Sequence, residues 1–150
     1  SLYVKPDRGK ELPGNFSARK GLLKPPVNGK IITKFGKYRN EELNIVNFRS
    51  GIDIRASRGE PIKAVFRGQV LYATWFKGYG NMIIIDHGDS YYTVYAHAQE
   101  LFKKKGDYVA TNEVIATVGD TASISEGPSL YFEVRHKGQA IDPTLWLQTG

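Results

Sequence analysis

The chain has 150 residues, of which 41% are hydrophobic, a size and composition typical of a single domain with its own core. It contains no cysteine, which excludes a disulfide framework and a thiolate metal site. No apolar run approaches the ~20 residues of a membrane span, so no transmembrane segment is expected in this chain.

The net charge of +6 is concentrated at the start of the chain. Residues 1–40 contain ten lysines and arginines against only Asp7 and Glu11, whereas residues 41–150 have a small acidic excess. A nucleic-acid-binding domain usually gathers its cations and aromatic side chains on one folded surface. A basic excess confined to one end does not fit that pattern, so no nucleic-acid partner is expected.

In chain order, residues 1–24 alternate charges with Gly and Pro without a clear period. We interpret them as a basic leader or linker, with Leu22 and Leu23 docking on the body. A turn-rich stretch opens the domain that is expected to cover residues 25–150. Lys30–Phe35 alternates as a strand, and the polar, acidic segment Tyr38–Phe48 is expected to be a loop.

From Gly51 onward the pattern indicates short β-strands separated by turns. A hairpin is predicted around Lys77–Gly80, a single helical turn at 99–104, and a final turn at Thr144–Leu147 with Trp146 packed on the body. The predicted strands cover residues 51–54, 61–66, 68–76, 81–87, 91–97, 108–110, 113–118 and 130–136.

Several spaced segments carry a recognisable signature. They are Arg49-Ser50-Gly51-Ile52-Asp53, Gly59-Glu60-Pro61-Ile62-Lys63-Ala64, Tyr95-Ala96-His97, Gly127-Pro128-Ser129-Leu130-Tyr131-Phe132-Glu133-Val134-Arg135 and Asp142-Pro143. Together they resemble the LytM-type (lysostaphin-like) zinc peptidases, which cut peptidoglycan cross-bridges, from about Pro26 to Leu147. The resemblance implies a mostly β fold, a two-layer antiparallel sheet of the barrel-sandwich kind, with an open groove and very short helices.

The resemblance also implies where zinc would bind, and those positions are altered here. The family's ligands are the His and Asp of His-x-x-x-Asp and the second His of His-x-His. The first position holds Arg49, a permanent cation. Asp53 is kept, but the third position holds Tyr131, a poor ligand because a tyrosine hydroxyl has a pKa of about 10. With two of three ligands replaced, we expect no zinc and no enzymatic activity.

Of two further histidine positions of that site, one is replaced here and the other is kept. The first His of His-x-His is replaced by Ser129, whereas the His on the neighbouring strand is kept as His97. The remaining histidines are His87, at a hairpin end, and His136. Because alternate residues of a strand share a face, His136 points away from the face of Ser129, and no substitute zinc site is expected.

The erased site leaves a groove rich in Tyr and Arg, residue types enriched in binding hot spots. Such a groove suits a peptide strand or an amphipathic helix. Its expected lining is Arg49, Ser50, Asp53, Tyr79, Met82, Tyr95, His97, Ser129, Tyr131 and Arg135. Asp53 is expected to form an ion pair with Arg49 or Arg135. His97 is expected to hydrogen-bond with Tyr131 or Ser129.

Within the family, residues 129–147 are most similar to the degenerate LytM domains that activate peptidoglycan amidases. That similarity implies a non-catalytic domain in the periplasm that binds and activates an N-acetylmuramoyl-L-alanine amidase as the septal wall splits in cell division. It also implies that the full-length protein is linked to an FtsEX-type complex. Two alternatives stay open: a passive peptidoglycan-binding module, and a residual zinc endopeptidase that acts on cross-links.

Overall fold

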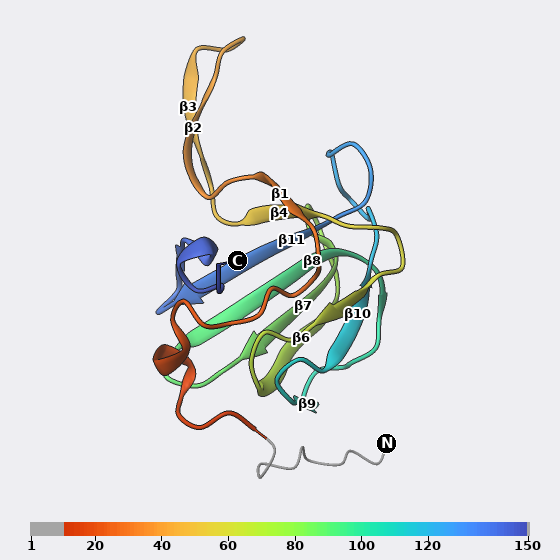
Figure 1. Ribbon diagram of the computed structural model, residues 1–150. Coiled ribbons are helices and arrows are strands. Elements are labelled where there is room, and N and C mark those ends of the chain that lie inside the picture. Colours follow the sequence, from red (N-terminus) through yellow and green to blue (C-terminus); the bar gives the residue numbers. More distant parts are fainter. Residues whose placement is uncertain (1–10, 150) are drawn as a thin grey trace.

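The structure is a computed structural model that describes residues 11–149, and it is built almost entirely of β-strands (Figure 1). The strands are β1 (Lys30–Thr33), β2 (Gly36–Asn40), β3 (Ile45–Arg49), β4 (Ile52–Arg55), β5 (Pro61–Lys63), β6 (Gly68–Phe76), β7 (Gly80–Asp86), β8 (Tyr91–Leu101), β9 (Tyr108–Val109), β10 (Val114–Val118), β11 (Ser129–His136) and β12 (Gln139–Ile141). The short 3₁₀ helices are η2 (Phe16–Arg19) and η3 (Pro143–Leu145). Among the described residues, no helix is long and apolar enough to cross a bilayer.

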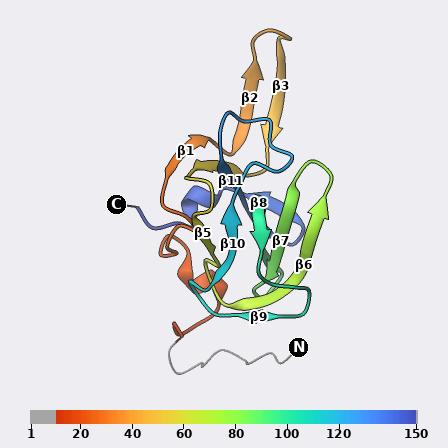
Figure 2. The same cartoon turned by 90° about the vertical axis from the view of Figure 1, so that its right-hand side faces the viewer.

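The main sheet is antiparallel, with the strand order β1-β4-β11-β8-β7-β6-β9. The long strand β8 pairs with β7 and β11, and its last residues pair with β10 instead. β10 also pairs with β5, so the sheet folds over at this edge into a second layer (Figure 2). The two-layer architecture expected from the sequence is therefore confirmed.

The core lies between these layers and follows from strand alternation. One face of the main sheet buries Phe132 of β11, Ile83 of β7 and Ile52 of β4, which belong to the same cluster as Ile62 and Ile115 of the second layer. Full burial of one such side chain stabilises the fold by about 1.5–3 kcal/mol. The opposite face of the main sheet does not pack against the second layer and carries a separate, smaller apolar cluster.

The described part of the expected leader is folded against the body. Asn15 caps η2 by accepting a hydrogen bond from the Ala18 N–H, and Phe16 is 0% exposed. The Phe16 ring stacks on Trp146, whose predicted burial is confirmed. Leu23 docks as expected, but Leu22 is exposed. Residues 11–24 thus contribute Phe16 and Leu23 to the core. Residues 1–10 lie outside the described part, and the domain boundary at residue 24 stays a prediction.

Two expectations about secondary structure are wrong. The segment taken for a loop is a hairpin, in which β2 and β3 pair in register from Gly36–Arg49 to Asn40–Ile45. Its acidic residues occupy only the turn, and that polarity concealed the two strands. In place of the helical turn expected at 99–104, residues 99–101 continue strand β8, because the end of β8 pairs with β10.

Candidate partner-binding groove

A groove lies on the face of the main sheet that points away from the core. Met82, Val94 and Ala96 form a small apolar cluster there, separate from the main core, against which Tyr79 and Tyr131 pack. A hollow of about 310 Å³ in this face is lined by Tyr72, Phe76, Tyr79, Met82, Ile84, Val94, Glu133 and Arg135. The floor is therefore apolar, with aromatic rings on one side and polar groups of β11 on the other.

A buried carboxylate organises the polar side of the groove. Glu133 is 1% exposed. Its Oε2 accepts a hydrogen bond of 2.5 Å from the Tyr131 hydroxyl and a longer one of 3.4 Å from the Tyr79 hydroxyl. Its Oε1 accepts from Arg135 Nη1 at 2.7 Å, and Arg135 Nη2 donates to the carbonyl of Gly138. The charge is thus paired, and three groove side chains are held by one group.

Glu133 was not among the residues expected to line the groove. The available signal was its position between Tyr131 and Arg135 on one face of a strand, where a carboxylate can reach both. An ionised Glu is almost never fully buried unless it is paired, so a strand with this pattern indicates an internal network.

Both groove tyrosines are held in the protonated form. Burial, followed by the hydrogen bond and negative charge of Glu133, raises the pKa of Tyr131 far above its ordinary value. Burial and the Glu133 charge raise the pKa of Tyr79 as well. A phenol that donates to a carboxylate is not available as a metal ligand, so Tyr131 acts here as a donor and an aromatic surface.

Asp53 and Arg49 do not form the expected ion pair. The Asp53 carboxylate accepts a hydrogen bond from the Thr33 hydroxyl. The backbone N–H of Asp53 donates a hydrogen bond to the oxygen of that Thr33 hydroxyl. Thr33 lies directly opposite Asp53 in the β1–β4 ladder, which brings its hydroxyl within hydrogen-bonding distance of the carboxylate. The Arg49 guanidinium instead lies 3.7 Å from the centre of the Tyr38 ring, and Arg135 is paired with Glu133.

His97 and Tyr95 also differ from expectation. Tyr95 is buried in the core, where its hydroxyl accepts from the Val65 N–H at 3.0 Å, so its placement in the groove was wrong. His97 has a φ of 64°, which breaks the alternation of β8 and leaves its ring centre 6.0 Å from that of Tyr131. The expected hydrogen bond to Tyr131 or Ser129 is not found among the described residues, and His97 Nδ1 instead lies 2.8 Å from the carbonyl oxygen of Thr121.

The remaining predicted residues frame the groove. Ser129 is buried and its hydroxyl has no hydrogen-bond partner among the described residues. Half-buried Ser50 precedes Gly51, where a Cβ would lie 2.8 Å from Tyr131 Cζ and 2.5 Å from the Phe132 carbonyl oxygen. The structure therefore brings together Tyr79, Met82, Tyr131 and Arg135.

These residues do not fit a zinc ion. The first ligand position carries a guanidinium stacked on a tyrosine, and the third carries a phenol committed to Glu133. The retained Asp53 is engaged by Thr33. Within residues 11–149, no three His, Cys, Asp or Glu side chains are grouped so as to hold a metal ion.

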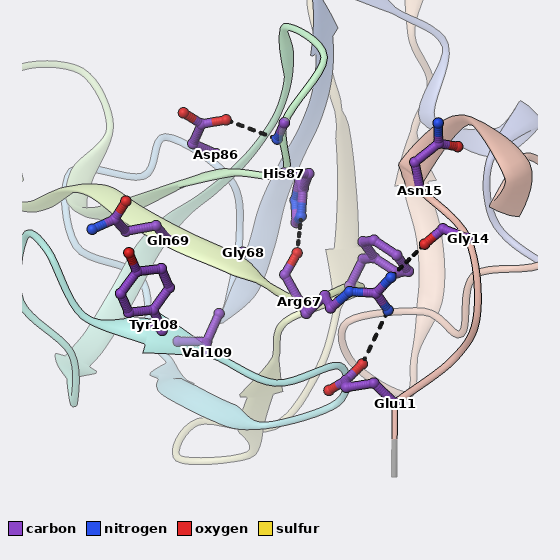
Figure 3. Close-up of a pocket in the computed structure, with 12 residues that line it drawn as sticks. Glu11, Gly14, Asn15, Arg67, Gly68, Gln69, Asp86, His87, Tyr108 and Val109 are labelled. Carbon is purple, nitrogen blue, oxygen red and sulfur yellow. Dashed lines mark hydrogen bonds and ion pairs between the residues drawn. The ribbon is translucent and has the colours of Figure 1, made fainter. Parts of the chain in front are cut away.

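A second pocket, of about 490 Å³, lies where the N-terminal segment meets the ends of β6 and β7 (Figure 3). Arg67 forms an ion pair with Glu11 at 3.5 Å and donates to the carbonyls of Leu12 and Gly14. Glu11 accepts from the N–H and hydroxyl of Thr111 at 2.8 and 2.6 Å. This network fastens the segment to the body, which is a structural role.

The fold agrees with comparisons to known proteins. The model of Peptidase family M23 matches residues 47–143. The chain therefore belongs to peptidase family M23, and the resemblance to LytM-type domains is confirmed.

Two of the similar proteins are named as murein hydrolase activators. The chain is 34% identical over 134 residues to "Murein hydrolase activator EnvC" of Escherichia coli, covering 89% of the chain and 31% of EnvC. It is 37% identical over 123 residues to "Murein hydrolase activator NlpD" of E. coli, covering 81% of the chain and 30% of NlpD. A zinc-containing peptidase of Vibrio cholerae has the same fold, with a TM-score of 0.76 and 27% identity over 83% of this chain and 40% of that one. The chain thus spans less than a third of the length of either activator.

Proposed function

We propose that this domain is a non-catalytic activator of a peptidoglycan amidase of the N-acetylmuramoyl-L-alanine class, and that it binds the amidase through the groove. The observation that carries the proposal is the Glu133 network, which holds Tyr131, the residue at an expected zinc-ligand position, together with Tyr79 and Arg135. The names of two relatives, which are murein hydrolase activators, support the same reading.

The groove has the properties of a binding site rather than of a hydrolytic one. Its apolar floor of Met82, Ile84 and Val94 can bury one face of an amphipathic helix or a peptide strand. Tyr79, Tyr131 and Arg135 supply the aromatic and guanidinium surfaces that dominate binding energies. Because their geometry is already set by Glu133, little conformational entropy is lost when a partner binds.

The free energy required is within reach of such a cluster. An activator that inverts a 1:99 ratio of open to closed amidase must bind the open state about 10⁴-fold more tightly, or roughly 5.5 kcal/mol. A handful of hot-spot residues, each contributing about 2 kcal/mol or more on truncation, is sufficient.

We propose that this activity takes place in the periplasm at the division septum, with the full-length protein linked to an FtsEX-type complex.

The test is release of dye from labelled peptidoglycan by the domain alone, by a purified periplasmic amidase alone, and by both. The proposal expects no release by the domain and stimulated release by the mixture. Tyr131→Ala and Arg135→Ala should abolish stimulation while the fold persists by circular dichroism. Phe102→Ala and Arg58→Ala, at exposed positions outside the groove, serve as matched controls and should stimulate normally.

Other outcomes identify the alternatives. Release by the domain alone, with stoichiometric zinc in the purified protein, would establish a residual endopeptidase. Co-sedimentation with sacculi without any effect on amidases would establish a passive peptidoglycan-binding module. Normal stimulation by both groove variants would show that the contact surface lies elsewhere.

A further inference from the structure

The hairpin β2–β3 stands away from the body and pairs with no other described strand (Figures 1 and 2). Its attachments lie near its base, where Phe35 meets Phe48 edge to face and Arg49 covers the Tyr38 ring. An isolated two-stranded hairpin is marginally stable in water, and this one adds no buried residue to the core. The projecting hairpin therefore does not serve to stabilise the core of the domain.

One face of the hairpin combines apolar and cationic side chains. Residues directly opposite each other in an antiparallel ladder share a face, and here Lys37 is opposite Phe48 and Arg39 is opposite Val46. Phe48 is 55% exposed and Val46 is 63% exposed. We call these four residues the hairpin face.

The charges of the hairpin face are not neutralised within residues 11–149. Neither Lys37 nor Arg39 belongs to any of the ion pairs of the described chain. Arg135, in contrast, is paired with the buried Glu133, so the groove itself offers a partner little net charge. An uncompensated positive face beside exposed apolar groups fits a partner surface that carries carboxylates around apolar residues.

We propose that the hairpin face is a second docking surface that binds an acidic, amphipathic segment of the same amidase that the groove activates. The inference rests on the proposed function. The groove activates the amidase, whereas the hairpin face binds it and raises its local concentration at the groove. Because β3 ends at Arg49, directly before Ser50 and before Gly51 beside Tyr131, one partner can contact both surfaces.

A protein partner is favoured over a membrane surface by the tip of the hairpin. Glu41 and Glu42 lie in the turn beside exposed Leu43. Two carboxylates at the leading end oppose insertion into an anionic lipid surface, which attracts Lys and Arg. The cations lie along the strands instead, where a docked segment of protein can reach them.

The test is a titration of amidase stimulation by wild-type protein and two double variants, Lys37→Glu/Arg39→Glu and Val46→Ser/Phe48→Ser. Each hairpin variant is expected to raise the half-maximal concentration about tenfold or more, with the maximal stimulation unchanged. The effect of the charge variant should shrink as salt rises, because exposed charges are screened. Association and dissociation rates on immobilised amidase provide an independent readout.

Failure of the hairpin inference and failure of the proposed function give different results in this titration. Lys105→Glu and Ile124→Ser alter exposed residues away from the hairpin and should leave the half-maximal concentration unchanged. If the wild type stimulates and both hairpin variants match it, the hairpin inference is wrong while the proposed function holds. If the wild type does not stimulate, the proposed function itself fails. Flotation of the wild type, but not of the variants, with phosphatidylglycerol vesicles and unchanged amidase binding would assign the face to a membrane.

Discussion

The Tyr131 hydroxyl donates a hydrogen bond of 2.5 Å to the carboxylate of Glu133, two residues further along the groove face of β11. In a zinc-binding member of the family, the position of Tyr131 would hold a histidine ligand. Here the side chain is turned to an internal partner, so the strand that would bind metal carries a hydrogen-bonded surface.

Removing the carboxylate should destabilise the domain and disorder the groove. In Glu133→Ala, Arg135 and Tyr131 lose their acceptor, and breaking a buried charge pair costs up to about 3–5 kcal/mol. Because Arg135 is partly exposed, we expect about 2–3 kcal/mol in urea unfolding at pH 7. Tyr131→Phe removes one donor and should cost about 1–2 kcal/mol, but it keeps the ring and much of the stimulation. An unchanged unfolding midpoint for Glu133→Ala would contradict the network.

The approach of Gly51 to the Tyr131 ring predicts that even a methyl group is not tolerated there. A Cβ on residue 51 would lie 2.5 Å from the Phe132 carbonyl oxygen, which is backbone and cannot move aside cheaply. Gly51→Ala should therefore destabilise the domain by about 1–3 kcal/mol and shift Tyr131 and Glu133. Thermal unfolding measures the first effect and amidase stimulation the second. Ser50→Ala, one residue earlier, should leave the thermal unfolding temperature unchanged.

The aromatic contacts of Phe16 predict that the segment before residue 25 is required for stability. Phe16→Ala leaves a cavity among Trp146, Phe66 and His87 and should cost about 3–5 kcal/mol in urea unfolding. Leu22→Ala, in the same segment but exposed, should cost less than about 0.5 kcal/mol. Equal effects of the two substitutions would mean that the segment does not dock as described.

The surroundings of His87 predict a loss of stability in mild acid. Desolvation lowers the pKa of His87 to about 4, although the Arg67 carbonyl and Asp86 act in the opposite direction. Because an unfolded His has a pKa of about 6.5, the unfolded chain binds the extra proton between these values. Stability is then fully present above pH 6.5 and declines as pH falls toward 4, by up to about 3 kcal/mol.

This pH dependence can be separated from that of other groups. Urea unfolding at intervals from pH 7.5 to 4 should show a steeper decline for the wild type than for His87→Gln, whose side chain does not titrate. Nuclear magnetic resonance titration of the imidazole gives its pKa directly. A His87 that titrates near 6.5 in the folded protein would contradict the prediction.

Strand alternation accounts for much of what could be anticipated, and its failures have local causes. Tyr131 and Arg135 were placed on one face, with His136 on the other, by the period of two, and His136 indeed stacks on Tyr91. Tyr95 was misplaced because the positive φ of His97 breaks the period in the middle of β8. Ion pairs for Asp53 were misjudged because its actual partner, Thr33, is brought to it by the register of β1 against β4.

The amino-acid sequence by itself determined the family, the strand-rich fold and the replacement of two zinc ligands, because these depend on residue identity and on spacing along single strands. Only the tertiary structure decided which groups pair. The burial of Glu133 beneath two tyrosines, the docking of Phe16 and the projection of the β2–β3 hairpin depend on which strands become neighbours. Contacts across strands far apart in the sequence are fixed by register and layer packing, neither of which is written in a local pattern.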